Sequence, residues 1–407
     1  MNKKKTPEKT APTVTKSSKP MSNDEFYKKL SRDDKQAIVD LSVDNPIRFI
    51  PAGSWVINSI IGDGTNTGKP GGYPRGHIVE IFGDESSGKT TLGVLACKQA
   101  QENGGQAVFM DFERTFHATY AQNLGLSLDK NKFTLMRPDH FQHGARLIRD
   151  ALLMKPWIIV VDSVSAMTPK ETLDGAIDEA GRIGLQAQLM SMFLGIITKK
   201  IPESESCLMF LNQMRTVINT SGYNRGGPQQ ESSGGNALKY YSSLRLKLNT
   251  IMTERVSATS LITGKEEKKA VNVLVKVTAI KNKIDVPAKT GPIYIRFGEG
   301  VDNIASIAEL AINIGTIKKS GAFYTFREGN EILFNCHGRE DLRRTLKEND
   351  LMLKKVCANL EVKEDKEAVP ETPEENYSDE MDAAFENVTK TYIEKQKKKK
   401  DEDEEAQ

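Results

Sequence analysis

The chain has 407 residues, of which 38% are hydrophobic and 28% charged, and its formal net charge is +2 at pH 7. This length predicts one large domain with appendages, or two to three domains, and the near-neutral charge does not by itself indicate nucleic-acid binding. The absence of a long apolar run or an apolar leader means that neither a membrane span nor a secretory signal is expected. The four scattered cysteines show no C-x-x-C pairing, which predicts reduced thiols in a cytosol-like compartment.

Both ends of the chain differ in composition from its centre. Residues 1–20 are rich in Lys, Thr, Ser and Pro, and residues 361–407 are rich in acids. Such segments cannot bury enough apolar surface to fold, so we predict a disordered basic tail and a disordered acidic tail. In residues 21–45, apolar side chains recur at helical spacing with polar residues between them, which predicts a small helical arm.

Between residues 46 and 297, short apolar strands alternate with amphipathic helices. The strands are expected at residues 78–82, 107–110, 157–161, 207–211, 243–248 and 272–280, and the helices at 91–101, 116–124, 142–153 and 184–199. This alternation predicts an α/β fold whose mostly parallel sheet is covered by helices on both faces.

The pattern changes after residue 298. A helix is expected at residues 304–314 and a long helical stretch at 338–360. Between them, residues 323–334 predict a hairpin whose turn contains Gly329 and Asn330. Residues 298–360 are therefore predicted to form a small α+β domain.

The most informative motif is residues 83–90, which match the phosphate-binding pattern G-x-x-x-x-G-K-[ST]. The loop joins an apolar strand to a helix, which disfavours the alternative of a ligand-free Gly/Ser loop. Its glycines let backbone N–H groups face phosphate oxygens, Lys89 can reach the β- and γ-phosphates, and Thr90 can hold Mg²⁺. The expected cofactors are ATP and Mg²⁺, with contacts from Gly83, Asp84, Glu85, Ser86, Ser87, Gly88, Lys89, Thr90 and Thr91.

Polar side chains follow three of the predicted strands. Asp162 ends the strand at 157–161 and can bind Mg²⁺ directly or through water, although a strand-terminating aspartate is the alternative. Glu113 follows the strand at 107–110 and is a candidate to orient the attacking water, whereas Asp111 can simply cap or pair locally. The amide of Gln213 can sense the γ-phosphate and relay its presence to the segment that follows.

Several separate blocks of the chain resemble one family. The blocks are GHIVEIFGDESSGKTTL, VVDSVSAMTPK, FLNQMRTVI, GGNALKYYSSLRL, KNKIDVP, GEGVDN and KKSGAFYTF. Together they resemble the RecA family of homologous-recombination ATPases, in order and with similar spacing over residues 46–347. The resemblance implies a RecA-type core over residues 46–297 and an N-terminal arm that polymerises the protein into a helical filament.

The resemblance also implies roles for single residues. Glu113 matches the catalytic glutamate, Tyr120 the aromatic that stacks on adenine, and Gln213 the glutamine that links the γ-phosphate to a DNA-binding loop. Lys281 and Lys283 match lysines that reach the ATP of the neighbouring subunit, where they would stabilise transition-state charge. Without the resemblance, these two lysines would be interpreted as a solvated basic loop.

Two loops, residues 174–184 and 214–235, carry the DNA contact that the resemblance implies. Long segments without helix or strand pattern inside a compact domain are usually functional or disordered. In the second loop, basic groups and a lone tyrosine suit the backbone and the bases of single-stranded DNA. The candidate DNA-binding residues are Arg182, Ser191, Met214, Arg215, Tyr223, Arg225, Gly234, Gly235 and Asn236.

The chain departs from the family at positions near both ligands. His117 stands where the bacterial proteins carry an aspartate near adenine, which puts purine selectivity in doubt. Two arginines that contact DNA in the family appear here as Gln188 and Gly195. Lys199 and Lys200, one turn further on, are candidates to compensate for this loss.

The function expected is that of an ATP-dependent recombinase. It would form a filament on single-stranded DNA, pair that strand with homologous duplex DNA, and hydrolyse ATP during recombination and repair in the cytoplasm of a bacterium or of a phage-infected host. A single-strand-binding protein and a loader are candidate further partners. The alternatives are a helicase or motor with the same core, and a regulatory DNA-binding filament without strand exchange.

Overall fold

The computed structural model describes residues 28–29, 46–65, 70–175, 179–217, 229–232, 235–259 and 266–364. The chain divides into two units, Met1–Pro46 and Ile47–Gln407, and the fold described below is that of the second unit. The predicted basic tail and all but two residues of the predicted arm lie outside the described residues, as does most of the predicted acidic tail.

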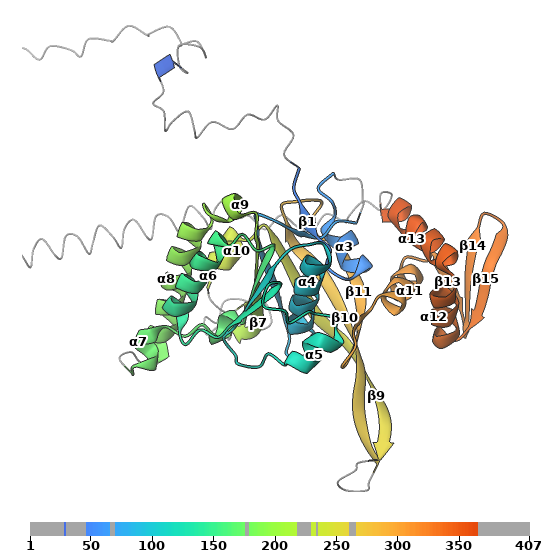
Figure 1. Cartoon of the computed structure of the whole chain (residues 1–407). Coiled ribbons are helices and arrows are strands. Elements are labelled where there is room, and N and C mark those ends of the chain that lie inside the picture. Colours follow the sequence, from blue (N-terminus) through green and yellow to red (C-terminus); the bar gives the residue numbers. More distant parts are fainter. Residues whose placement is uncertain are drawn as a thin grey trace, which may run out of the picture. The chain divides into compact units, whose positions relative to one another are not determined.

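A ten-stranded sheet forms the centre of the second unit (Figure 1). Its order is β12-β11-β10-β9-β3-β7-β6-β4-β5, and β8 pairs with β7 outside this path. From β9 to β5 every pair is parallel, whereas β9, β10, β11 and β12 pair antiparallel. The strands are β3 (Ile78–Gly83), β4 (Ala107–Asp111), β5 (Phe133–Met136), β6 (Ile158–Asp162), β7 (Cys207–Val217), β8 (Gln229–Ser232), β9 (Leu244–Thr259), β10 (Glu266–Asn282), β11 (Thr290–Arg296) and β12 (Gly300–Asp302).

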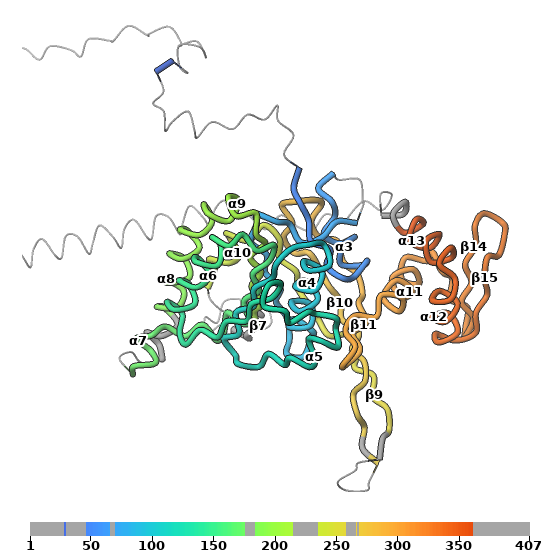
Figure 2. The backbone as a smooth tube through the Cα atoms, in the orientation of Figure 1, coloured from blue at the N-terminus to red at the C-terminus, as the bar shows by residue number. Residues whose placement is uncertain are grey.

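Helices cover both faces of the parallel part of the sheet, as the sequence predicts (Figure 2). Alternate residues of each strand enter two separate apolar clusters because successive side chains point to opposite faces. On β6, Val160 joins the cluster that contains α4, while Val161 joins the cluster that contains α6 and α8. The helices of this region are α4 (Lys89–Glu102), α5 (Ala118–Asn123), α6 (Phe141–Leu153), α7 (Lys170–Leu173), α8 (Glu179–Ile197), α9 (Ile201–Ser204), α10 (Ala237–Tyr241) and a 3₁₀ turn at Val164–Ala166.

The strands β9 and β10 are much longer than the sequence predicts. β3 pairs with β9 only over residues 244–248, and β11 pairs with β10 only over residues 272–278. Outside these residue ranges, β9 and β10 pair only with each other among the described strands and extend from the sheet as a two-stranded ribbon (Figure 1). The extension has few buried residues, so the periodicity of burial that identifies a strand in the sequence is weak there.

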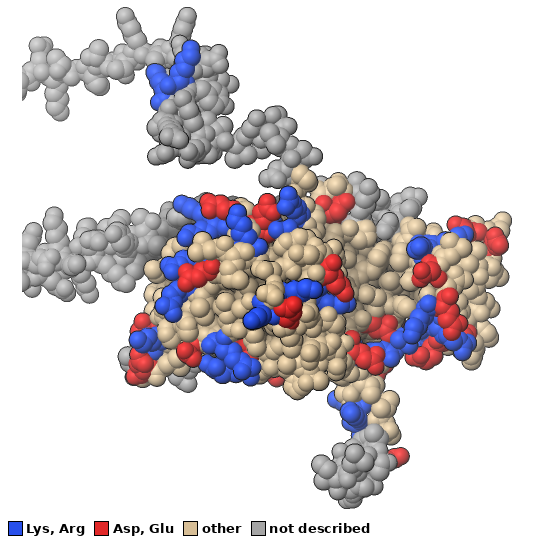
Figure 3. All heavy atoms as spheres, viewed as in Figure 1, with Lys and Arg blue, Asp and Glu red and all other residues tan. Residues whose placement is uncertain are grey.

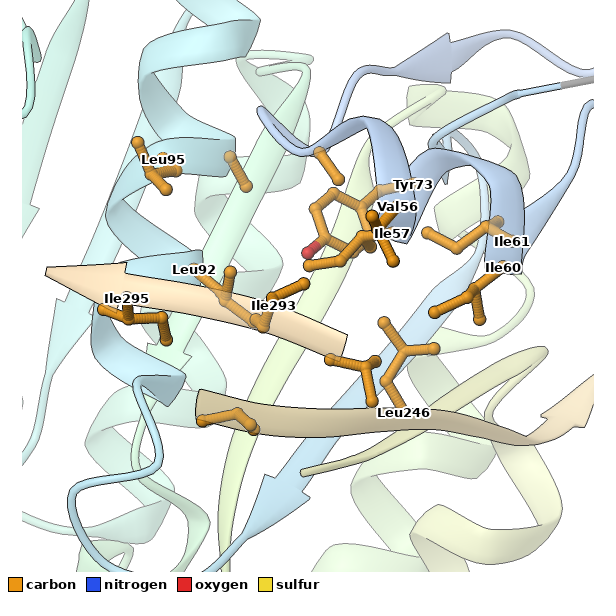
Figure 4. Packing of buried hydrophobic residues seen from close by; sticks show 14 of the residues in the cluster. Val56, Ile57, Ile60, Ile61, Tyr73, Leu92, Leu95, Leu246, Ile293 and Ile295 are labelled. Atoms are coloured by element: carbon orange, nitrogen blue, oxygen red, sulfur yellow. The ribbon is translucent and has the colours of Figure 1, made fainter. Parts of the chain in front are cut away.

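A helix that the sequence analysis did not predict, α3 (Trp55–Ile61), closes the antiparallel side of the core. The Ser54 side chain accepts a hydrogen bond from the backbone N–H of Ile57 at 3.4 Å and caps the helix. Figure 4 shows Val56, Ile57 and Ile60 facing Ile293 of β11 and the apolar face of the sheet. Two short strands, β1 (Phe49–Ile50) and β2 (Tyr73–Pro74), pair antiparallel beside the helix.

The C-terminal part combines helices with a small antiparallel sheet, which agrees with the predicted α+β class, but the third strand of that sheet, β13 (Ile317–Ser320), was not predicted. The expected hairpin is present, with Gly329 and Asn330 between β14 and β15. One apolar cluster runs from Ile295 of the central sheet through Ile307 to Phe326 of the small sheet. The boundary at residue 298 therefore stays a prediction. The elements are α11 (Asn303–Asn313), β13 (Ile317–Ser320), β14 (Phe323–Glu328), β15 (Glu331–His337), α12 (Arg339–Glu348) and α13 (Asp350–Glu364).

Charges of both signs are interspersed on the face of the molecule shown in Figure 3. That face therefore presents no large field of one sign that would attract DNA by itself. Among the described residues, no helix combines the length and the apolar character that crossing a membrane would require.

Candidate active site and nucleic-acid interface

The loop at residues 83–90 folds around its own lysine at the carboxyl end of β3. Lys89 Nζ donates hydrogen bonds to the carbonyl oxygens of Gly83 at 3.0 Å and Asp84 at 2.5 Å. Ser86 and Gly88 have φ angles of 58° and 88°, the left-handed region that glycine adopts readily. Successive N–H groups in such a turn form a concave site for anions, so the loop is shaped for phosphate.

The positions inside this loop differ in exposure. Ser87 is buried and its Oγ donates to the carbonyl oxygen of Asp84 at 2.7 Å, while Glu85 and Ser86 are exposed. A Cβ atom on Gly83 would lie 2.3 Å from the carbonyl oxygen of Leu248, so only glycine fits beside β9. The loop is therefore held on its sheet side and open on the side where phosphate would bind.

Thr90 and Asp162 meet at the position predicted for magnesium. Thr90 Oγ1 donates to Asp162 Oδ2 at 2.7 Å, and Asp162 is 5% exposed at the end of β6. Burial raises the pKa of Asp162 to about 6, with Glu113 adding to the rise, while the hydrogen bond from Thr90 opposes it. Burial lowers the pKa of Lys89, and the negative charge of Asp162 opposes this shift.

This donor set fits a hard divalent cation. Mg²⁺ prefers oxygen ligands and is usually bound by one or two protein oxygens together with substrate phosphates. Among the residues that the structure describes, no group of three or more His, Cys, Asp or Glu side chains could hold a metal alone. A hydroxyl and a carboxylate beside a phosphate loop are the arrangement expected for a metal that arrives with a nucleotide.

Glu113 follows β4 and lies within reach of groups from two neighbouring strands. Its Oε1 accepts hydrogen bonds from Ser163 Oγ and, at 3.4 Å, from Gln213 Nε2. The backbone N–H of Glu113 also bonds the carbonyl oxygen of Asp162 at 3.4 Å. The structure thus brings together Glu113, Asp162 and Gln213, which the sequence analysis had placed on three separate strands.

The sequence analysis missed the serines beside Glu113. Ser163 follows Asp162 directly, and its Oγ also lies 2.6 Å from Ser165 Oγ. Two hydroxyl residues immediately after a buried strand, in the run Asp-Ser-Val-Ser, were the available signal. Ser163 can hold the carboxylate of Glu113 in one orientation.

Asp111 caps the local turn and pairs with a nearby arginine, which is the local role considered for it in the sequence analysis. It is fully buried, and its carboxylate accepts from the backbone N–H groups of Thr115 at 3.0 Å and Phe116 at 3.2 Å, and from Arg137 Nε at 3.1 Å. These bonds fix the turn between β4 and α5. Asp111 therefore shapes the segment that carries Glu113.

Tyr120, the predicted adenine contact, lies on α5 and is half-buried. Its hydroxyl is 2.8 Å from Thr91 Oγ1, so it lies beside the start of α4. The exposed His117 caps the same helix, and its Nδ1 accepts from the backbone N–H of Tyr120 at 3.2 Å. Stacking of Tyr120 on adenine stays a prediction.

The two candidate interface lysines lie at the end of β10. Lys281 Nζ donates to the carbonyl oxygens of Lys239 at 2.5 Å and Tyr240 at 2.9 Å, near the carboxyl end of α10. The pKa of Lys281 is lowered to about 8, mostly by burial and also by the nearby positive charges of Lys283 and Arg245. The Lys283 side chain is exposed. Lys281 is thus bound to the helix that follows the second predicted DNA loop.

The first predicted DNA loop is partly wrong. Residues 174–184 were expected to lack regular structure, but α8 begins at Glu179, so Arg182 lies in its first turns. Alanine, leucine and glutamine favour the helix, and Gln186 Nε2 anchors it by donating to Val164 O at 3.0 Å and Met167 O at 3.1 Å. Residues 176–178 lie outside the described part.

Further along α8 lie a candidate DNA-binding residue and two positions at which the chain differs from the family. Ser191 and Gln188 are exposed, and Gly195 is half-buried beside Tyr241. Lys199 and Lys200 are exposed just beyond the end of the helix. Lys199 lies about one turn beyond Gly195 and about three turns beyond Gln188, and compensation by Lys199 and Lys200 stays a prediction.

The second predicted loop also contains regular structure at both ends. β7 continues through Met214 and Arg215 and pairs antiparallel with β8, with Arg215 opposite Glu231. Thr216 and Val217 at the end of β7 are β-branched and favour a strand, whereas β8 has no such residue and depends on its pairing with β7. Tyr223, Arg225 and Gly234 lie outside the described residues.

The end of this loop meets α8. Gly235 has a φ of 74°, and a Cβ atom there would lie 2.9 Å from Cβ of Ala187. Asn236 follows and is the N-cap residue of α10. The end of the second predicted DNA-binding segment thus lies against α8, three residues beyond the end of the first predicted segment.

Comparison with known proteins gives a consistent result. The family model described as the RecA N-terminal domain matches residues 27–302. Protein RecA of Borrelia duttonii is 38% identical over 286 residues, which cover 70% of this chain and 72% of the relative. Protein RecA of Chlorobaculum tepidum is 36% identical over 322 residues, covering 78% and 85%, and that of Bacillus licheniformis 35% over 310 residues, covering 75% and 81%. The chain belongs to the RecA family.

Proposed function

We propose that this RecA-family recombinase binds ATP and Mg²⁺ at the carboxyl end of its sheet and uses them to control its grip on DNA. A bound Mg²⁺–ATP supplies a γ-phosphoryl group and a metal that neutralises its charge. The phosphate-loop N–H groups and Lys89 hold the phosphates, and Thr90 and Asp162 hold the metal. Glu113 orients the attacking water, and Gln213 contacts the γ-phosphate.

One observation carries the coupling to DNA. Gln213 Nε2 bonds Glu113 Oε1 at 3.4 Å, and the same strand continues without a break into the β7–β8 hairpin. A change at Gln213 therefore acts directly on the segment that carries Arg215. In this proposal the γ-phosphate withdraws Gln213 from Glu113 and thereby biases the hairpin towards its DNA-binding arrangement.

The proposed DNA-binding surface combines that hairpin with α8. The phosphates would be contacted by Arg182 and Ser191 of α8 and by Arg215 of β7. Tyr223 would stack on a base of the single strand, and Arg225 would neutralise its phosphate charge. Contact with phosphates carries no sequence information, so pairing with a homologous duplex would select the partner strand. The remaining proposed contacts come from Met214, Gly234, Gly235 and Asn236.

Assembly into a helical filament completes the proposal. Lys281 and Lys283 would reach the ATP of a neighbouring subunit, and the arm at residues 21–45 would bind the next copy. Lys281 is bound to the end of α10, so its engagement in trans would act on that helix too. A single-strand-binding protein and a loader, in a bacterial cytoplasm, are the further partners proposed.

A strand-exchange assay tests the proposal. Purified protein, ATP, Mg²⁺, a circular single strand and its linear homologous duplex should give joint molecules, and Lys89→Ala should give none. Directional unwinding without pairing would instead indicate a motor, and filaments without joint molecules a structural protein. Family membership favours neither of these alternatives.

The DNA surface has its own test. Tyr223→Ala combined with Arg225→Ala should weaken single-strand binding and leave ATP binding unchanged, as measured by fluorescence anisotropy and nucleotide titration. Binding should also fall with salt, with a log–log slope of about −0.7 per phosphate contact. Equal DNA affinity in the double variant would contradict the assignment of this segment.

A further inference from the structure

Three polar side chains are buried in the sheet behind the phosphate loop. Glu80 in the middle of β3 and Asn212 on β7 have no exposed surface, and Arg245 on β9 is 8% exposed. β3 lies between β7 and β9, and the register pairs Glu80 with Arg245 and Phe82 with Asn212. Because residues i and i+2 of a strand share a face, all three side chains lie on one face of the sheet.

The carboxylate of Glu80 bonds both of the other groups. Arg245 Nε donates to Glu80 Oε2 at 2.5 Å, and Asn212 Nδ2 donates to Glu80 Oε1 at 2.9 Å. The Arg245 guanidinium also lies over the ring of Phe82, 4.7 Å from its centroid. A buried carboxylate is tolerated because it is paired and hydrogen-bonded, but such a pair contributes little net stability compared with apolar residues.

The charge on Glu80 decides how the amide of Asn212 is turned. An ionised carboxylate only accepts hydrogen bonds, so the amide must present its NH₂ group to Glu80. The amide oxygen then faces away, and Asn212 Oδ1 accepts from the backbone N–H of Gln213 at 2.9 Å. The next link is Gln213 Nε2, which donates to Glu113 Oε1.

We propose that Glu80 is a positioning residue for Gln213, acting through the orientation of Asn212, with Arg245 holding the Glu80 carboxylate in place. A continuous set of bonds thus runs from β9 through the strand of the phosphate loop to the strand that leads into the DNA-binding hairpin. Glu80 touches neither nucleotide nor DNA in this proposal. The inference rests on the proposed role of Gln213 as the residue that senses the γ-phosphate.

The test compares three variants. Glu80→Gln keeps the shape but offers both a donor and an acceptor, so it no longer sets the orientation of Asn212. Because that variant breaks the buried ion pair between Glu80 and Arg245 and can unfold, the decisive protein is the double variant Glu80→Gln with Arg245→Met, which removes both charges. Gln213→Ala is the reference for complete loss of sensing.

The readout is the ratio of single-strand affinities measured with a non-hydrolysable ATP analogue and with ADP. Coupling of this kind typically amounts to about 5–150-fold, and the double variant should lose most of it and match Gln213→Ala within about threefold. Its affinity for the ATP analogue and its thermal midpoint should stay close to wild type. A purely structural network would move the midpoint and leave the ratio unchanged.

Two results would overturn the inference, and they are distinguishable. If the double variant keeps the wild-type ratio while Gln213→Ala loses it, Glu80 does not position Gln213 and the proposed function stands. If Gln213→Ala itself keeps the wild-type ratio, the sensing role of Gln213 is wrong, and the inference about Glu80 falls with it.

Discussion

Replacing Asp162 with asparagine is expected to stabilise the nucleotide-free protein at neutral pH and to weaken its hold on magnesium. The side chain is 5% exposed, and burial raises its pKa from 3.8 to about 6. Asparagine has nearly the same shape, and its oxygen can still accept the hydrogen bond from Thr90. The substitution therefore removes the buried charge with little change in packing.

The magnitude follows from the pKa. A carboxyl whose pKa is higher in the folded protein than in the unfolded chain favours folding below the unfolded pKa and loses that contribution as the pH rises through the folded pKa. A rise from 3.8 to about 6, at about 1.4 kcal/mol per pKa unit, corresponds to about 3 kcal/mol. The advantage of Asp162→Asn in the free energy of unfolding should grow from near zero at about pH 4 to about 3 kcal/mol at about pH 8.

Urea unfolding followed by circular dichroism, without nucleotide or metal and at several pH values, measures this difference. Asp111→Asn is the matched control, because Asp111 is an equally buried carboxylate on the adjacent strand that accepts two backbone N–H bonds and one from Arg137. The control should be less stable than wild type at neutral pH because it loses charge-assisted bonds. An Asp162→Asn protein that is less stable than wild type at about pH 8, or whose difference does not grow with pH, would refute the reasoning.

Four other substitutions give three separate tests. Glu113→Gln should keep ATP-dependent DNA binding but lower kcat by about 10²–10⁴-fold, because it removes the group that activates water. A single-turnover rate within about tenfold of wild type would count against that role. Lys89→Ala and Lys281→Ala should each be inactive alone but regain ATPase activity when mixed. In the mixture, the intact phosphate loop of a Lys281→Ala subunit can receive Lys281 from a neighbouring Lys89→Ala subunit. Mixtures that are no more active than their components would argue against action in trans. Asp302→Asn should lower the free energy of unfolding by about 1–3 kcal/mol in denaturant titrations, because Asp302 caps α11 and accepts from two arginines, and unchanged stability would contradict that estimate.

The parallel half of the sheet and the phosphate loop are predictable from the sequence because they obey strong local rules. β4 and β6 are apolar runs buried on both faces and β3 is such a run with one polar residue, and each expected boundary lies within a residue or two of the observed one. The phosphate-loop motif starts at Gly83, the last residue of β3, and places Lys89 and Thr90 at fixed positions after it. The placement of Asp162 next to Thr90 then follows from the shared edge of parallel strands.

The misses have different physical causes. Arg182 lies in a helix because Gln186 anchors α8 to the segment after β6, a contact between residues about twenty positions apart that no local pattern reveals. The role of Ser163 depends on a carboxylate fifty residues earlier in the chain. The buried Glu80 reads in the sequence as one polar interruption of an apolar strand, and only its partners on β7 and β9 explain it.

In the proposed mechanism, the order of the strands would let nucleotide and DNA be coupled through few residues. β7 lies between β3 and β6, so Gln213 is in register with Gly83 of the phosphate loop, while Leu211 is in register with Asp162. Gln213, the proposed γ-phosphate contact, is therefore on the same strand as the hairpin that we propose to bind DNA. A strand bonded on both sides cannot slide by a fraction of a residue without breaking its hydrogen-bond ladder. A displacement at Gln213 would therefore be passed on to residues 214–217, where β8 is the only described strand that pairs with β7.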